Sequence, residues 1–367
     1  MIGTFVVFVI LTLGLYFEAV APVADFWFQP YIAADAAAYW ELSGVRPGAL
    51  TAEKADSDSG PQFGGGSFGP VLQAKLFRTD LGVLLSNFAM LALMLWVVST
   101  MKEFDLSTFT LLLLLNPLLF SVVATLNKEI FAITGLILFL RYMTAKRYRF
   151  LLLTAAILVS FGGHWQQAAV LLMLCCLESR FSPLRNKPWA GVVTILLFFT
   201  VAYTLVFHLV PIVIAALLAQ AEAGHTIVIL DNIQGNFGFP LVVIPKILMN
   251  VMGYLSTPTY FLQRYWSEDF SNWYGQIFMQ AQEFLTTALL FGLLIARRLP
   301  LKQPLVYLLV VYFILTAVNP MVQPRYEYPA YVLLCLQAAR YFRLGGRVSG
   351  TTRSQSSLAA HTAHFLT

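Results

Sequence analysis

The sequence predicts an all-α fold. The predicted architecture is a polytopic transmembrane helix bundle of about ten spans, with an interfacial or re-entrant outer segment and both termini cytoplasmic. Three observations lead to this. First, 59% of the 367 residues are hydrophobic and only 11% are charged, whereas soluble proteins carry about a quarter charged residues. Second, the apolar residues form runs that approach the roughly 20 residues needed to span a bilayer. Third, basic residues recur between alternate runs.

The apolar runs give the predicted spans in chain order. The first, at about 5–21, has no basic residue before it, and we interpret it as a retained span rather than a cleaved signal peptide. The polar stretch 25–80 is a predicted outer loop, because its Ser/Asp/Gly/Pro-rich centre, 56–70, shows neither helical nor strand periodicity. Further spans are predicted at 81–100, 108–124, 130–142, 150–161, 167–177, 189–210, 283–296, 304–318 and 330–342.

Several of these spans are short, and the short ones occur in pairs with a break between them. One break is Asn127-Lys128-Glu129, and the other begins with two glycines and continues to His164 and Trp165. Lipid cannot satisfy free backbone amides, so helices stop within a membrane protein where the broken backbone lines a wet cavity. Both breaks are therefore predicted cavity walls.

The distribution of charge orients the bundle. With the N-terminus in the cytoplasm, most bases fall on the inner side and most acids on the outer side, as the positive-inside rule requires. The inner bases are Lys102, Arg141, Lys146, Arg147, Arg149, Arg180, Arg185, Lys187, Arg297, Arg298, Lys302, Arg340, Arg343, Arg347 and Arg353. The net charge of +5 therefore reflects topology, and we expect no nucleic-acid partner.

Parity constrains the region between the basic loops at Arg185 and Arg297, which must contain an even number of crossings. The two flanking spans satisfy this, so the apolar segment 239–255 is predicted to lie in the outer interface or to be re-entrant. It would cross the membrane only if 212–221 formed a further span.

The predicted organisation is one membrane domain, 1–345, with outer loops at 25–80 and 211–282. A Ser/Thr-rich basic tail, 346–367, is predicted to be disordered and cytoplasmic. The cysteines lie in apolar runs without ligand spacing, so they are interpreted as packing residues rather than as disulfide or metal sites.

Polar residues near the outer surface are the candidate site, because ionisable groups at membrane depth are costly. Asp35 lies in an Ala-rich stretch that favours a helix, with Tyr39 on the same face. It is either a carboxylate held at the bilayer edge as general base or metal ligand, or an ordinary loop acid.

The two breaks supply further candidates. Lys128 would bind a phosphate oxygen, helped by the dipole of the following helix, unless it and Glu129 only form a solvated turn. His164, beside Trp165, is either a wall of a polar pocket or a structural residue. No second His lies at ligand spacing, so no His-based metal site is expected.

The segment 319–329 precedes the last span and presents Arg325 and Tyr326 at the membrane boundary. The planar fork of arginine suits bidentate phosphate binding, although Arg325 would also suit simple snorkelling within an aromatic belt. Lys246 is a further predicted outer cation for phosphate.

Three short motifs together resemble the GT-C superfamily, multi-span glycosyltransferases that use polyprenyl-phosphate-linked sugars. They are Asp35 to Tyr39 after the first span, Asn127 to Glu129 between two helices, and Arg325 to Pro329 before the last helix. The length of the chain and the position of its Lys-Glu break resemble the Wzy and EpsG-type exopolysaccharide and O-antigen polymerases more than the larger protein mannosyltransferases of the same superfamily.

The resemblance implies that Asp35 acts as base or metal ligand and that Lys128 and Arg325 hold the lipid phosphate. The chain departs from the pattern by lacking paired acids in the first loop, which weakens a metal-dependent mechanism. It also lacks the paired arginines of large outer loops, unless His164 and Lys246 take their roles.

The predicted function is saccharide transfer from a polyprenyl-phosphate-type carrier to an acceptor at the outer face of the bacterial cytoplasmic membrane. Asp35 and His164 are the candidate catalytic residues for this reaction, and the candidate saccharide-binding residues are Tyr39, Glu129, Trp165 and Tyr326. The expected partners are the lipid-linked donor, the saccharide acceptor, membrane lipid and other polysaccharide-assembly proteins. The sequence specifies no cofactor, and it leaves open whether the reaction uses a divalent metal ion. A flippase for lipid-linked saccharide is the chief alternative. A membrane acyltransferase, which would need a deep His such as His164 or His208, ranks third.

Overall fold

The structure is a computed structural model that describes residues 2–15, 39–40, 43, 68–211, 214, 225–253, 273–319 and 324–343. All regular secondary structure in these ranges is helical and none is strand, which confirms the predicted all-α class. Asp35 and the tail 346–367 lie outside the described residues, and so does the side chain of Arg325.

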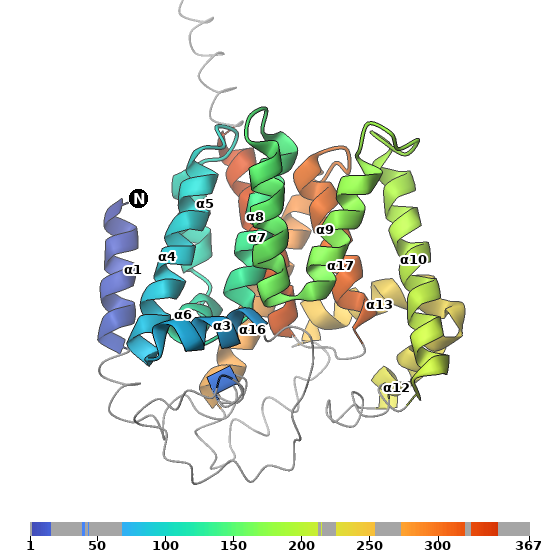
Figure 1. Ribbon diagram of the computed structural model, residues 1–367, viewed down its shortest axis with the longest axis horizontal. Coiled ribbons are helices and arrows are strands. Elements are labelled where there is room, and N and C mark those ends of the chain that lie inside the picture. Colours follow the sequence, from blue (N-terminus) through green and yellow to red (C-terminus); the bar gives the residue numbers. More distant parts are fainter. Residues whose placement is uncertain are drawn as a thin grey trace, which may run out of the picture.

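Most of the helices run side by side along one direction (Figure 1). Each of them overlaps one of the predicted apolar runs. They are α1 (Ile2–Leu15), α4 (Asp80–Ser99), α5 (Leu106–Leu114), α7 (Glu129–Thr144), α8 (Arg149–Gly163), α9 (Trp165–Leu177), α10 (Pro188–Leu209), α16 (Trp273–Ile295), α17 (Pro304–Val318) and the helix over 328–343.

Among the described residues, three helical stretches are long and apolar enough to cross a membrane: Leu81–Ser99, Pro188–Leu209 and Thr226–Val251. A bent pair, α5 with α6 (Leu118–Ala124), would make a fourth. These stretches agree with an integral membrane protein. Other apolar helices, such as α8 and α9, are shorter than a bilayer crossing.

The predicted continuous span 108–124 is broken. Its halves, α5 and α6, are bent by 88° relative to one another. Pro117 lies at the break, and proline has no N–H to donate and disfavours helical backbone in the residue before it. The side-chain oxygen of Asn116 accepts a hydrogen bond from the Leu118 amide at 3.0 Å, which satisfies one amide at the start of α6.

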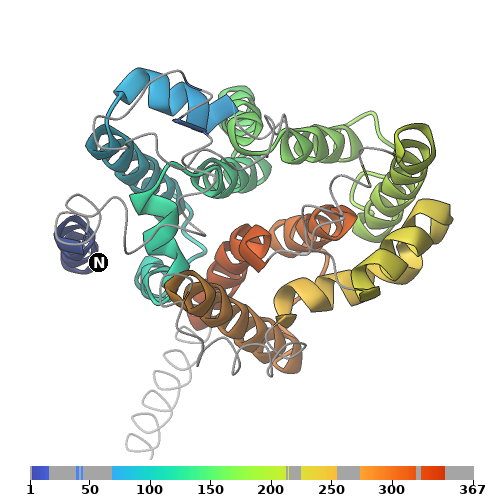
Figure 2. The ribbon, with the colours of Figure 1, turned by 90° about the horizontal axis from the view of Figure 1, so that it is seen from below.

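Besides α6, two more helices lie across the direction of the bundle, at the end opposite the N-terminus (Figures 1 and 2). One is α3 (Phe68–Phe77), so the prediction of loop throughout 25–80 is wrong for these residues. Gly69 lets α3 approach α8 closely, because a Cβ there would lie 2.5 Å from the carbonyl oxygen of Gly162. α3 is thus packed closely against α8.

The other transverse helix is α13 (Phe239–Val251), which follows α12 (His225–Ile233) and a π-helical turn at Gln234–Gly238. Within that turn, Asn236 and Phe237 leave helical geometry, with φ of 60° at Phe237. The stretch is long enough to span a bilayer, and α13 lies across the bundle, the orientation that an interfacial or re-entrant segment would have (Figure 2).

The helix over 328–343 occupies the interior of the bundle (Figure 2). It is apolar on all sides along most of its length, and Tyr331, Leu334 and Cys335 have no exposed surface. A helix that is hydrophobic all round is expected to be buried. Its first turn therefore starts from the centre of one end of the molecule.

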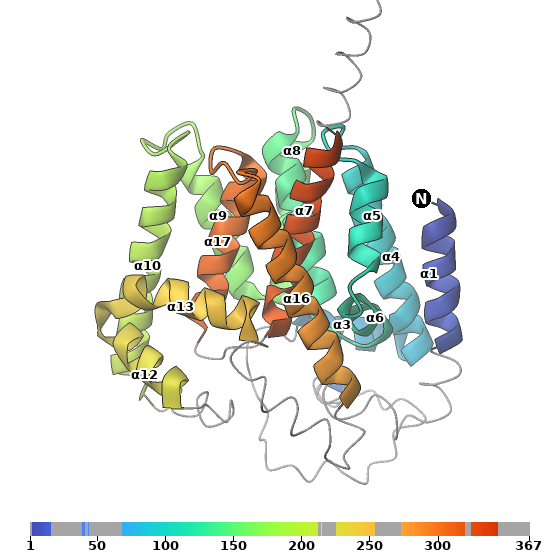
Figure 3. The same cartoon turned by 180° about the vertical axis from the view of Figure 1, so that it is seen from behind.

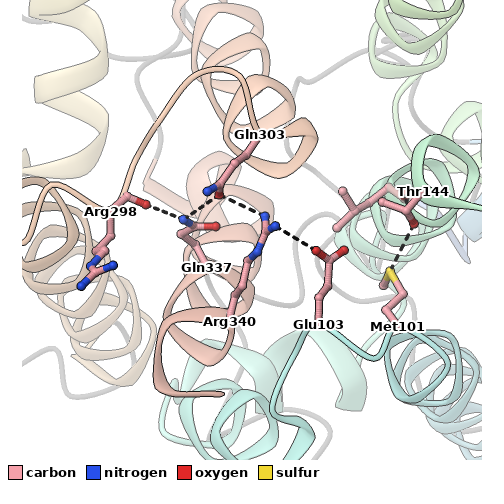
Figure 4. A network of polar contacts seen from close by, with 8 residues as sticks. Met101, Glu103, Thr144, Arg298, Gln303, Gln337 and Arg340 are labelled. Carbon is pink, nitrogen blue, oxygen red and sulfur yellow. Dashed lines mark hydrogen bonds and ion pairs between the residues drawn. The ribbon is translucent and has the colours of Figure 1, made fainter. Parts of the chain in front are cut away.

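At the N-terminal end of α1, polar contacts join segments that carry the predicted inner bases (Figure 4). Arg340 pairs with Glu103 at 3.1 Å and donates to the Gln303 side chain at 3.0 Å. Gln337 donates to the carbonyl oxygen of Arg298, and Arg343 to that of Phe104. The turns after α4, α7, α9 and α16 all lie at this end, here called the basic end (Figures 1 and 3).

Candidate functional site

Three helix junctions lie at the end of the bundle opposite the basic end (Figure 1). They are the turn before α7, the break between α8 and α9, and the 3-10 turn η4 (Pro324–Glu327) before the central helix. The sequence predicted candidate residues in all three: Lys128, His164 and Tyr326.

These three side chains meet. The Lys128 ammonium lies 5.1 Å from the centroid of the Tyr326 ring, within the range of a cation–π interaction. The His164 ring contacts the same tyrosine edge-on, with 6.1 Å between ring centroids and an interplanar angle of 88°. A cation, an imidazole and a phenol from distant segments thus form one cluster, here called the junction cluster.

Buried amides hold the Lys128 turn in place. The Asn87 side chain donates to the carbonyl oxygens of Val123 and Thr125, both at 2.9 Å, where α6 ends. Gln73 of α3 in turn donates to the Asn87 oxygen at 2.7 Å. These bonds satisfy carbonyls that the broken helix leaves open, as a membrane interior demands. The position of Lys128 is therefore specified by packed polar contacts.

The His164 break depends on glycine and glutamine. Gly163 brings α8 close to the Lys128 turn, because a Cβ there would lie 2.8 Å from the Lys128 carbonyl oxygen. The Gln167 amide donates to the Ala132 carbonyl and the Ser160 hydroxyl, both at 2.9 Å. These bonds join α7, α8 and α9 directly beside His164.

The η4 turn is tied to α17 by two hydrogen bonds. The Tyr312 hydroxyl donates to the Tyr326 carbonyl oxygen at 3.0 Å, and the Thr316 hydroxyl donates to the Glu327 carboxylate at 2.6 Å. Glu327 has no exposed surface. Burial raises the pKa of Glu327 to about 8, against a smaller lowering by the Thr316 hydrogen bond. At neutral pH this carboxyl is therefore mainly protonated.

The junction cluster lies where helices begin. α7 starts directly after Lys128 and α9 directly after His164, and neither residue caps its helix with a side-chain hydrogen bond. At α7 the Asn127 side chain accepts a hydrogen bond from the first amide, that of Glu129, at 3.0 Å. The first N–H groups of a helix have no partner within the helix, and its dipole favours an anion there. Together with Lys128, this geometry suits a phosphate group.

The other predicted residues surround the junction cluster in different ways. Glu129, in the first turn of α7, is only 2% exposed, whereas Trp165 is 47% exposed. Tyr39 is buried and belongs to a small apolar cluster with Leu126, next to the Lys128 turn. Arg325 lies in η4 by its backbone.

Lys246 lies apart from the junction cluster, within α13. Its side chain has no exposed surface, and its ammonium pairs with Asp231 at 2.5 Å and donates to Gln234 at 2.6 Å. We therefore leave Lys246 out of the proposed phosphate site, because an internal carboxylate already neutralises it. Sequence reasoning missed Asp231, although an acid inside the apolar run 226–233 was a signal for it.

Comparison with known protein families, curated proteins and solved structures finds no match for this chain. Within the described ranges, no three His, Cys, Asp or Glu residues are grouped so that they could hold a metal ion.

Proposed function

We propose that the chain is an integral membrane glycosyltransferase or polysaccharide polymerase. It would transfer a saccharide from a polyprenyl-phosphate-type carrier to an acceptor at the outer face of a bacterial cytoplasmic membrane, in exopolysaccharide or O-antigen-like synthesis. One observation carries this proposal: Lys128, His164 and Tyr326 meet at one end of the bundle, where α7 and α9 begin.

The junction cluster supplies what a phosphate-linked sugar requires. An ammonium and two helix N-termini attract the phosphate. Aromatic rings at Tyr326 and the half-exposed Trp165 offer flat surfaces for a saccharide. A lipid carrier keeps its tail in the membrane and its sugar in water, so its reactive bond lies at the interface. A cluster at the end of a membrane bundle suits that position.

In the proposed step, an acceptor hydroxyl attacks the anomeric carbon of the donor. The bond from that carbon to the phosphate oxygen breaks, and the phosphate leaves with the bonding electrons. Lys128 stabilises this charge, as preorganised cations do in phosphate-leaving reactions, and Arg325 joins it. Asp35 accepts the hydroxyl proton. The packing of Tyr39 beside Leu126 supports bringing the segment after α1 toward the junction cluster.

The proposal includes ten membrane spans, one for each predicted apolar run, with both termini and the basic end in the cytoplasm. The gathering of the turns after α4, α7, α9 and α16 at one end supports this orientation under the positive-inside rule. The junction cluster would then face outward.

A second candidate function is a flippase for the same lipid-linked saccharide. It is favoured by the buried Asp231–Lys246 pair beside a broken helix, since charged groups and discontinuous helices inside membrane proteins mark many transport pathways.

Binding and chemistry are tested separately. The purified chain in nanodiscs should gain thermal stability from undecaprenyl diphosphate and not from undecaprenol, which lacks the phosphate. A chain stabilised equally by both lipids would contradict a phosphate site. In cells, loss of a transferase leaves lipid-linked saccharide in the outer leaflet, where an added label reaches it. Loss of a flippase leaves it in the inner leaflet, so the two functions give different labelling.

A further inference from the structure

The ammonium of Lys246 lies in a shell of oxygen atoms inside the protein. It is 2.5 Å from a carboxylate oxygen of Asp231, 2.6 Å from the amide oxygen of Gln234 and 3.3 Å from the carbonyl oxygen of Asn319. The side chains of Lys246 and Asp231 have no exposed surface. Tyr203 adds its ring at 6.0 Å from the ammonium.

These oxygens come from backbone arrangements that favour a cation. Asn319 directly follows α17, and the C-terminal end of a helix carries the negative end of its dipole. Asp231 and Gln234 lie on either side of the boundary where α12 gives way to the π-helical turn. Carbonyls at helix ends and a carboxylate beside a broken helix are the ligands with which membrane proteins bind monovalent cations.

We propose that Asp231, Gln234 and the Asn319 carbonyl form a monovalent-cation site that the ammonium of Lys246 fills from within the chain. Lys246 is thus a tethered cation, and a small free ammonium ion is the class of ligand that fits the site without it. This inference does not depend on the proposed transfer reaction.

The occupied site has a structural consequence for the junction cluster. Gln234 also donates to the carbonyl oxygen of Val318 at 2.9 Å, so the site fixes the last residues of α17. α13 packs against both α17 and η4. The tethered cation therefore holds the end of α17 against α13, the helix that also packs against η4.

Chemical rescue tests this site. Lys246→Ala leaves the buried carboxyl group of Asp231 without its cation, so the melting temperature of the purified protein in detergent should fall by about 10 °C. Methylammonium chloride at 200 mM should restore about half of this loss. Tetramethylammonium chloride at the same concentration should restore none, because it is too large for the space that the lysine leaves.

Two controls make the result specific. The variant Lys75→Ala, which removes an exposed lysine of α3, should respond equally to both salts. In Asp231→Leu/Lys246→Met, no charge remains, so the melting temperature should stay near that of the wild type and methylammonium should have no special effect. Equal melting temperatures of Lys246→Ala in the two salts would overturn the proposal.

If Lys246→Ala does not accumulate, abundance in the membrane replaces the melting temperature. The proposal then requires that Asp231→Leu/Lys246→Met accumulates like the wild type, because it leaves no unpaired carboxylate. Equal loss of the single and double variants would overturn it.

Discussion

The ammonium of Lys128 lies over the ring of Tyr326, 5.1 Å from its centroid, although the two residues belong to different halves of the chain. Lys128 precedes α7, whereas Tyr326 lies in the turn that starts the central helix. Their contact joins two helix beginnings into one cationic and aromatic surface, and this surface is the basis of the proposed phosphate site.

Lys128→Gln removes the charge and keeps a side chain of similar length. A charge-assisted hydrogen bond contributes about 1.5–3 kcal/mol, so the Kd for undecaprenyl diphosphate should rise roughly 10- to 100-fold. Titration of the lipid against intrinsic fluorescence in nanodiscs measures this. Lys102→Gln, an exposed lysine at the basic end, is the matched control and should bind like the wild type. A normal Kd for Lys128→Gln would remove Lys128 from the site.

Tyr326→Phe keeps the ring under the Lys128 ammonium, while Tyr326→Leu keeps bulk without a π face. A cation–π interaction contributes about 0.5–2 kcal/mol. Binding of the same lipid should therefore weaken about 2- to 30-fold in Tyr326→Leu and stay near normal in Tyr326→Phe. Equal weakening in both variants would show that the hydroxyl, rather than the ring, matters.

Gly163→Ala tests the close approach of α8 to the Lys128 turn. The new Cβ would lie 2.8 Å and 3.0 Å from backbone atoms of Lys128 and Ala132, and backbone cannot move aside cheaply. Overpacking of this kind costs about 1–3 kcal/mol, so the melting temperature should fall. Gly292→Ala is the matched control, since its Cβ meets nothing within 4 Å and alanine favours the helix. Equal melting temperatures in the two variants would argue against the packing.

Glu327 gives stability a pH dependence with a defined sign. Its pKa is raised from an ordinary value of 4.5 to about 8. Between these values the unfolded carboxyl has lost its proton while the folded one keeps it, so stability falls as pH rises through this range. Glu327→Gln, which mimics the protonated form, should lose this component. Melting curves at pH 5.5, 7 and 8.5 measure the difference, and parallel trends for the two proteins would refute the assignment.

Asp35→Asn tests the proposed base, which lies outside the described residues. The variant should still bind undecaprenyl diphosphate, because the phosphate groups are unchanged, but transfer should fall at least about 100-fold, the contribution expected of a general base. Lipid-linked saccharide should then accumulate in the outer leaflet with short or absent polymer. Glu103→Gln at the basic end is the control. Normal polymer made by Asp35→Asn at normal abundance would exclude this carboxylate.

The positions of the helices that run along the bundle could be predicted from hydropathy, because each of them overlaps a long apolar run in the sequence. Lys128, His164 and Tyr326 were expected near one another because the predicted topology puts both helix breaks and the segment 319–329 on the same side of the membrane. The break at Pro117 was in the sequence as well, although it lies inside an apolar run that we predicted to be continuous.

Other features depend on contacts that a linear pattern does not contain. α3, which contains Gly69 and Pro70, packs closely on Gly162 of α8. Lys246 was predicted to face the outer surface, but a π-helical turn lets Asp231 reach it. Asn87 donates to the carbonyl oxygen of Thr125, 38 residues further along the chain, and the sequence around Asn87 does not indicate this partner.

The network of Figure 4 bears on the order of assembly during synthesis. In it, Arg340 pairs with Glu103, and Gln337 donates to the carbonyl oxygen of Arg298. Outside this view, Arg343 donates to the carbonyl oxygen of Phe104. The ribosome makes all three donors after every other described helix has been synthesised. These contacts can therefore form only after the helix over 328–343 has been synthesised.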